Sequence, residues 1–246
     1  MIENPEQERA LRREMVKSHE LPGRGFNIEN LPGERSETIN ELGYPKTETI
    51  RDPEQEIMRD GKKEQALLWQ KRWDYVRKQG PDTQWQDTEE VKSITEIERE
   101  YSDNGQTELE RGRHQMKEHD WETLRNYDER GALTKEEGKV TAGEKKGEHW
   151  EVSIERTQVG SYTEIIETTT GERAVTTAGQ TTLEAHRTVK VQYRNADNTS
   201  VFGWKQTEGD PESHHSWGVK PIDLLPGQRL REPLDFFKET GREAGQ

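Results

Sequence analysis

Two adjacent histidines near the end of the chain, His214 and His215, have the side chains best suited to chemistry. They are flanked by Asp210, Glu212 and Trp217, and imidazole together with carboxylate is a donor set that binds divalent metals. Adjacent residues on a strand point in opposite directions, so only one of the two imidazoles would enter a single site. We therefore interpret this segment as a polar loop and predict no metal site.

Two further histidines, His114 and His119, are five residues apart. On a helix this spacing places them on different faces, and the i, i+4 spacing of helical zinc motifs is missing. The chain has no cysteine, no G-x-S-x-G, no P-loop and no G-x-G-x-x-G. Carboxylates are so abundant that no pair stands out as a glycosidase pair. We predict no catalytic residue, no cofactor and no metal, and hence a protein that is not an enzyme.

The bulk composition indicates a chain with too little apolar surface for a large core of its own. Apolar residues make up 27% of the 246 residues, charged residues make up 35%, and the net charge is −13. Such values are typical of disorder, but seven Trp and six Tyr are far too many for a disordered tail. We therefore expect the core to be completed by neighbouring chains.

The same composition excludes several classes of partner. An acidic chain lacks the basic face that nucleic acids require, and no apolar run approaches the ~18 residues that span a bilayer. The first residues lack the apolar core of a signal peptide. We expect no nucleic acid partner, no membrane span, no signal peptide and synthesis in a cytoplasm.

The pattern along the chain predicts an α+β protein. Residues 1–51 are interpreted as an extended N-terminal arm laid across a partner, with a polar helix within residues 1–19 whose Leu11 and Val16 face inward. The sequence Leu-Pro-Gly occurs at Leu21, Leu31 and Leu225. We predict a turn at each, because Pro-Gly suits the two central positions of a type II turn.

Residues 52–131 are predicted to be a small polar helical region. Capping signals precede three thin apolar stripes, which would start after Asp52, Asp87 and Thr107. Stripes of this width suit either a seam with another subunit or a small helical layer on the chain's own sheet. Residues 132–148, rich in Gly and Lys, are interpreted as a linker.

Residues 149–206 are predicted to be a threonine-rich, mainly antiparallel β domain. Trp150, Val152 and Ile154 alternate with polar residues, and β-branched residues favour strands. The two architectures that fit are an antiparallel meander or small sandwich, and an intertwined trimeric β-stalk. Residues 207–246 are interpreted as an extended C-terminal docking tail, or hook, that binds either its own domain or a neighbour.

The threonine-rich stretch resembles the β-stalks of tailed-phage fibres and spikes. The combination of arm, polar helices, polar sheet and apolar tail likewise resembles neck, tail and fibre proteins of bacteriophage virions. The resemblance implies a non-enzymatic structural subunit of a virion, whose partners are copies of itself and other structural subunits. We expect its buried contacts with neighbours at seven interface candidates: Trp69, Trp73, Trp121, Trp150, Leu225, Phe236 and Phe237.

Two other functions fit the sequence. The first is a carbohydrate- or peptide-binding module that stacks glycan or peptide on exposed Trp204 and Trp217. The second is a virion-associated hydrolase, for which two carboxylates would have to converge in a cleft.

Overall fold

The computed structural model describes residues 5–79, 84–208 and 210–218 of the chain. These residues form one helix, α1 (Pro5–Lys17), and twelve strands. The chain divides into two compact units. Unit 1 comprises Met1–Ala132 and Gly138–Gly147, and unit 2 comprises Leu133–Glu137 and Glu148–Gln246.

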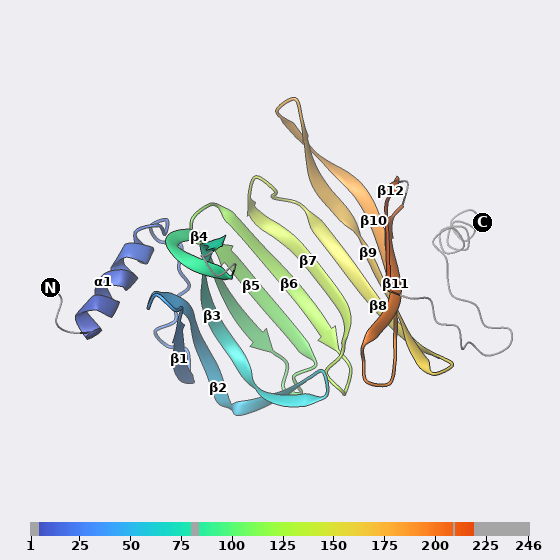
Figure 1. Ribbon diagram of the computed structural model, residues 1–246, viewed down its shortest axis with the longest axis horizontal. Helices are drawn as coiled ribbons and strands as arrows, with labels where there is room; N and C mark the ends of the chain where they lie inside the picture. Colours follow the sequence, from blue (N-terminus) through green and yellow to red (C-terminus); the bar gives the residue numbers. More distant parts are fainter. Residues whose placement is uncertain (1–4, 80–83, 209, 219–246) are drawn as a thin grey trace. The chain divides into compact units, whose positions relative to one another are not determined.

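Each unit is an antiparallel meander whose strands are hydrogen-bonded in the order in which they occur in the sequence (Figure 1). The strand β7 (Leu133–Gly143) contributes residues to both units. The other strands of unit 1 are β1 (Glu34–Ile39), β2 (Pro45–Arg59), β3 (Lys62–Gln79), β4 (Trp85–Tyr101), β5 (Thr107–His114) and β6 (His119–Tyr127). The other strands of unit 2 are β8 (His149–Val159), β9 (Tyr162–Thr177), β10 (Gln180–Arg194), β11 (Ser200–Thr207) and β12 (Asp210–Gly218).

The coarse prediction of a threonine-rich antiparallel β region is confirmed, because β8 to β11 pair antiparallel within one chain. This is the pattern of the meander alternative. Threonine supports the pairing directly: the hydroxyls of Thr188 and Thr207 lie 3.0 Å apart across β10 and β11, and those of Thr176 and Thr181 lie 2.9 Å apart across β9 and β10. Such cross-strand hydrogen bonds stabilise a sheet that has few apolar side chains.

The predicted helical region at residues 52–131 is wrong, because these residues form β2 to β6. The spacing of Trp69 and Trp73 explains part of the error: four residues apart is one face of a helix and also one face of a strand. Thr107, predicted to cap a helix, begins the strand β5. In this strand Glu108 and Glu110 point to one face of the sheet and Leu109 points to the other. The protein is therefore nearly all β rather than α+β.

A β-bulge produced the strongest false helical signal. Val91 and Ile94 are three residues apart, which in a regular strand would place them on opposite faces. The register with β3 pairs Asp74 with Ser93 but Tyr75 with Val91, so Lys92 is an inserted residue. The insertion returns Val91 and Ile94 to the same apolar cluster.

The predicted linker at residues 132–148 is also mostly strand, because β7 occupies Leu133–Gly143. The predicted polar loop around His214 and His215 is likewise a strand, β12. The Leu-Pro-Gly motif at Leu21 forms a turn with Gly23 at a φ of 73°, whereas the motif at Leu31 forms only a bend, with Gly33 at a φ of 123°. The third motif, at Leu225, lies outside the described residues.

Helix α1 covers one face of unit 1. Its Val16 is buried, as predicted, against a cluster drawn from the β1–β2 turn, β3 and β4. Leu11, which was predicted to face inward, is 51% exposed. The helix is tied to the sheet by Arg13, which pairs with Glu37 of β1, and by Arg12, whose guanidinium lies 5.0 Å from the centre of the Tyr44 ring.

The segment after α1 lies across β4, β5 and β6 of its own unit, whereas the sequence interpretation placed it on a partner. The backbone N–H of Leu21 donates to the carbonyl of Gln115 over 2.8 Å, and Arg24 pairs with Asp120. The guanidinium of Arg113 lies 4.2 Å from the centre of the Phe26 ring. The arm therefore forms part of the fold of unit 1.

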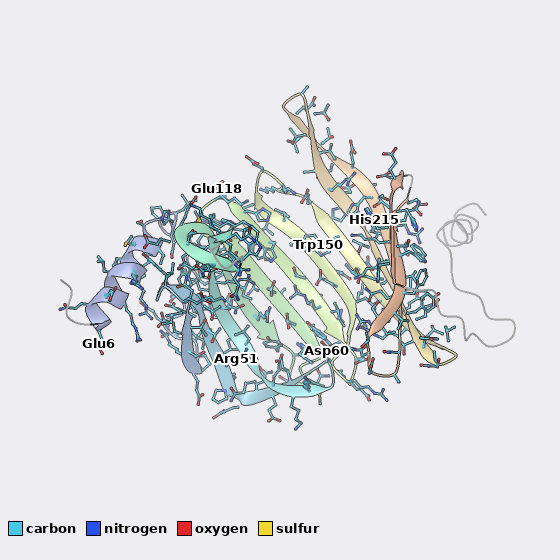
Figure 2. The ribbon with its side chains drawn as sticks, in the orientation of Figure 1. Glu6, Arg51, Asp60, Glu118, Trp150 and His215 are labelled. Atoms are coloured by element: carbon cyan, nitrogen blue, oxygen red, sulfur yellow. The ribbon has the colours of Figure 1, made fainter. Side chains whose placement is uncertain are left out.

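The far end of the β2–β3 hairpin closes the other end of unit 1. The backbone N–H of Asp60 donates to the carbonyl of Gly131 over 3.1 Å, so the hairpin turn is tied to the turn after β6 (Figure 2). Ile57 is buried against Gly105 in the β4–β5 turn. This closure carries Arg59 onto the face of β5 and β6.

Candidate functional site

His214 and His215 both lie on β12. The ring of His214 lies against that of Trp204, with ring centres 6.5 Å apart. In the register of β11 and β12, the neighbouring residue His215 is opposite Lys205. Figure 2 shows His215 on β12. The described parts of the chain contain no group of three or more His, Asp or Glu side chains arranged to hold a metal ion.

His114 and His119 were predicted to be separated on a helix, but they lie on β5 and β6, at the end of one hairpin. Burial, Lys117, His119 and Arg24 together hold the pKa of His114 below its ordinary value.

The two tryptophans proposed as stacking platforms differ. Trp204 is 1% exposed and belongs to the apolar cluster of unit 2, so the prediction that it presents an exposed face is wrong. Trp217 is half-buried and lies over Gly203, its partner across β11 and β12; a Cβ at Gly203 would lie 2.4 Å from the indole. Glycan contact through Trp217 stays a prediction.

The same tryptophan-over-glycine arrangement occurs across β5 and β6. Trp121 faces Gly112, and its ring occupies the space that a side chain at position 112 would need. Indole over glycine repairs the weak packing of a glycine in a strand. This gives Trp121 and Trp217 a structural reason to be present.

The described interface candidates all lie in the sheet. Trp69 and Trp73 are buried within unit 1, and Trp121 is half-buried on β6. Trp150 is half-buried on β8, and its indole N–H donates to Glu136 over 2.8 Å (Figure 2). Leu225, Phe236 and Phe237 lie outside the described residues. A role for these seven residues in contacts with neighbours stays a prediction.

A cluster of charged side chains lies on β2, β4, β5 and β6. Glu108 and Glu110 are buried, and three arginines surround them. Arg125 donates to Glu108 over 2.8 Å and to Glu110 over 3.1 Å. Arg99 reaches Glu110 at 2.8 Å, and Arg59 reaches Glu108 at 3.0 Å. We call these five residues the arginine–glutamate network.

Aromatic side chains complete this network. The Arg59 guanidinium lies 3.6 Å from the centre of the Tyr127 ring, and the Tyr127 hydroxyl donates to Glu108 over 3.4 Å. Burial and the charge of Glu108 raise the pKa of Tyr127 to about 12. Burial alone would raise the pKa of Glu110, but Arg125 and Arg99 hold it below its ordinary value.

This geometry does not suit glycoside hydrolysis. A hydrolase needs one carboxyl group that is protonated at working pH, and therefore has a raised pKa. Glu110 has a lowered pKa, and both carboxylates accept hydrogen bonds from arginine. The network ties β2, β4, β5 and β6 together and offers no general acid at Glu110.

A second buried carboxylate, Glu96, has neutral partners. One of its oxygens accepts from the Trp69 indole over 2.7 Å and from the Phe26 backbone over 3.2 Å. The other accepts from the Gln115 amide over 2.7 Å. Burial raises the pKa of Glu96, against the opposing effect of Trp69, Lys71 and Phe26. Glu96 therefore holds the N-terminal arm on the sheet.

A cavity of about 290 Å³ lies between α1, the arm, β1, β2 and β3. Ile28, Ile50 and Trp69 form its apolar lining. Its four charged lining residues are already paired within the chain: Arg13 with Glu37 and Glu48, and Arg35 with the carbonyl of Ile28.

Large apolar side chains are exposed at the α1 end of unit 1. Four of the seven large apolar side chains that are most exposed among the described residues belong to α1, to the end of β1 and to the turn after it. We call this set the N-terminal surface: Leu11, Met15, Ile39 and Leu42. Arg12 and Arg13 hold α1 against β1 and Tyr44, so the four residues belong to one end of the unit.

The sequence interpretation missed both the N-terminal surface and the arginine–glutamate network. The only signal for the network was the alternation of Glu108 and Glu110 with other residues. The signal for the N-terminal surface was the spacing of Leu11 and Met15. The two residues are four apart on a helix, which places them on one face, whereas Val16 is the residue that points inward.

Comparison with known proteins gave no match to a family model, to a curated protein or to a solved structure. No helix among the described residues is long and apolar enough to cross a membrane. The function of this chain is therefore inferred from its own sequence and geometry.

Proposed function

We propose that this chain is a non-enzymatic structural subunit of a large assembly, and that the assembly is a tailed-bacteriophage virion. The observation that carries the proposal is the N-terminal surface, because exposed apolar side chains that gather at one end of a unit mark protein-binding sites. The resemblance of the sequence to neck, tail and fibre proteins supports the choice of a virion.

The partner that this surface would bind is a second copy of the chain. Structural subunits commonly bind copies of themselves through a self-complementary patch. Leu11, Met15, Ile39 and Leu42 would be covered in the contact, with the arginines of α1 at the rim. The buried charges fit this role, since the arginine–glutamate network and Glu96 stiffen the sheet that presents the surface.

Incorporation into particles tests the proposal. We expect mass spectrometry of virions purified from the source culture to detect the chain, and Leu11→Asp/Leu42→Asp to reduce its copy number at least about tenfold, since buried unpaired carboxylates oppose association. Leu183→Asp is the matched control, because Leu183 is an exposed leucine in the β9–β10 hairpin and belongs to unit 2. Absence of the wild-type chain from purified virions would contradict the virion assignment.

A further inference from the structure

The first strand of unit 1, β1, lies at the edge of the sheet (Figure 1), and among the described residues no strand lies beyond it. β1 pairs with β2, and no other described backbone hydrogen bond involves residues 34–38. All six residues of β1 are exposed, whereas the interior strand β5 alternates buried and half-buried residues. An open strand edge offers its backbone N–H and C=O groups to a strand of another chain.

The part of β1 that is suited to regular pairing is short and has Ser36 at its centre. The register with β2 is continuous from Glu34 to Thr38 and shifts between Thr38 and Ile39. At the other end, Gly33 has a φ of 123°, which is outside the range of an extended strand. Regular pairing with a further strand is therefore available to five residues, which are Glu34, Arg35, Ser36, Glu37 and Thr38.

The charges of this segment favour one register for antiparallel pairing with the β1 strand of a second copy. When the two copies of Ser36 are opposite each other, each Arg35 is opposite a Glu37. In the same register each Glu34 is opposite a Thr38, so all five residues are paired and no like charges meet. Opposite charges across a strand pair stabilise it, and like charges destabilise it.

The neighbouring registers are less favourable. A shift of one residue places each Glu34 opposite a Glu37, and the shift in the other direction leaves Arg35 opposite Thr38. Shifts of two residues place Arg35 opposite Arg35 or Glu37 opposite Glu37. Charges on an edge strand commonly prevent pairing. Here the two signs alternate, so they oppose the shifted registers and permit the one centred on Ser36.

Arg35 has groups to spare for such a contact. Its guanidinium donates to the carbonyl of Ile28 over 3.1 Å, and it has no acidic partner within the described part of the chain. A guanidinium has five N–H donors, and a carboxylate such as that of Glu37 accepts more than two hydrogen bonds. The ion pair with Arg13 of α1 therefore leaves Glu37 able to accept from a second arginine.

The same pairing would bring the two α1 helices to one face of the joined sheet. Arg35 and Glu37 are opposite Ile50 and Glu48 of β2, and Arg13 of α1 contacts both glutamates. These side chains therefore share the face on which α1 lies. A two-fold axis perpendicular to the sheet relates antiparallel copies of one strand and keeps like faces together. The N-terminal surfaces of the two copies would then lie on the same face, on either side of the axis.

We propose that two copies of the chain associate by pairing their β1 strands antiparallel across a two-fold axis at Ser36. The sheets of the two copies of unit 1 then become one sheet, and two ion pairs between Arg35 and Glu37 set its register. This inference rests on the self-association in the proposed function. It adds the strand that pairs, the register and the residues that determine it.

A single cysteine tests the register in the full-length chain, which has no cysteine of its own. Directly opposite residues have Cα atoms about 4.5–5.5 Å apart, which a disulfide can join. We expect mild oxidation to convert most of Ser36→Cys to a covalent dimer. Glu34→Cys is the matched control, because its two copies would be four residues out of register, roughly 13 Å apart. An equal mixture of Glu34→Cys and Thr38→Cys should form the mixed disulfide.

Exchanging the charges tests the ion pairs. We expect Arg35→Glu and Glu37→Arg each to weaken self-association at least about tenfold, because two attractive pairs become two repulsive ones. An equal mixture of the two variants should associate as the wild type does, since every arginine again faces a glutamate. Unchanged association of Arg35→Glu, or a mixture that associates no better than its components, would overturn the proposal.

Sedimentation velocity separates failure of this inference from failure of the proposed self-association. A wild-type chain that dimerises, together with Ser36→Cys that dimerises but forms no disulfide, would overturn the β1 pairing and leave the self-association standing. A wild-type chain that remains a monomer would contradict both.

Hydrogen exchange of the wild type needs no variant and therefore covers the case in which a substitution disturbs folding. We expect exchange within residues 34–38 to slow at least about tenfold when the concentration is raised from the monomer to the dimer range, because added strand pairing protects the outward amides. The peptide covering β5, an interior strand, is the internal control. Unchanged exchange within residues 34–38 in the dimer would overturn the proposal.

Discussion

Glu96 and Glu110 lie on the neighbouring strands β4 and β5 and are both buried, yet their pKa values move in opposite directions. Neutral N–H groups of Trp69, Phe26 and Gln115 hold Glu96. Arginine side chains hold Glu110. Burial disfavours a charged carboxylate. At Glu110 the two arginines outweigh this effect of burial, whereas at Glu96 the hydrogen bonds from neutral groups do not.

The difference shows how a sheet with few apolar side chains is held together. The arginine–glutamate network joins four strands through ion pairs, and its arginines lower the pKa of Glu110. Glu96 attaches the arm through hydrogen bonds. Its negative charge is less well stabilised than that of Glu110, because burial raises its pKa. The two sites therefore predict different responses to mutation and to pH.

The largest expected effect is that of Glu110→Gln. The substitution removes the charge but keeps the size, and it leaves Arg99 and Arg125 with one buried partner fewer. Breaking a buried ion pair by removing one partner costs about 3–5 kcal/mol. Urea unfolding at neutral pH measures this cost. A loss below about 1 kcal/mol would show that the network behaves like an exposed ion pair.

We expect a smaller effect for Glu96→Gln. The amide NH₂ of the new glutamine faces one of the three N–H groups that now donate to Glu96, so one buried donor loses its acceptor. Loss of the buried negative charge offsets part of this cost in unfolding free energy. The net loss is about 1–2 kcal/mol. Unfolding should begin with faster hydrogen exchange at Phe26, because the arm loses its attachment. A loss as large as that of Glu110→Gln would remove the distinction between the two sites.

The pH dependence of stability should have opposite signs for the two carboxylates. Because the folded pKa of Glu96 is raised, its contribution is fully present below the ordinary pKa of 4.5 and is lost as pH rises through the folded value. Because the folded pKa of Glu110 is lowered, its contribution is present above 4.5 and is lost as pH falls through the folded value. Each unit of pKa shift corresponds to about 1.4 kcal/mol.

Urea unfolding of the wild type, Glu96→Gln and Glu110→Gln over pH ~3 to ~8 measures these slopes. The stability advantage of the wild type over Glu96→Gln should shrink as pH rises. Its advantage over Glu110→Gln should shrink on acidification. Slopes of the same sign in both comparisons would contradict the assigned causes of the two shifts.

The smallest expected effect is that of Glu100→Gln, which serves as a reference for both buried sites. Glu100 is 60% exposed and pairs with Arg111 over 2.5 Å. Exposed ion pairs contribute at most about 1 kcal/mol. Urea unfolding of the wild type and of Glu100→Gln at low salt should show this small difference in unfolding free energy. At high salt the difference should be equal or smaller, since salt screens exposed ion pairs.

Only part of this fold could be predicted from the sequence. The helix around Val16 and the threonine-rich strands were predictable, because each pattern fits only one type of secondary structure. The i, i+4 spacing of Trp69 and Trp73 fits a helix and a strand equally well, and the bulge at Lys92 gave Val91 and Ile94 a helical spacing. These local patterns outweighed the β-branched character of the region.

The site was harder to predict than the fold. Arg59, Arg99, Glu108 and Arg125 meet only because of the register of four strands, and register depends on which faces are buried. The exposure of Leu11 depends on which side of α1 Arg13 ties to Glu37. Composition and spacing contain neither kind of information.

Sedimentation velocity tests the central claim that the N-terminal surface binds a second copy of the chain. We expect the wild type to sediment faster as its concentration rises through the micromolar range, and Leu11→Asp/Leu42→Asp to remain a monomer with unchanged thermal unfolding. A wild-type chain that remains a monomer at every concentration, indistinguishable from the double variant, would contradict the account.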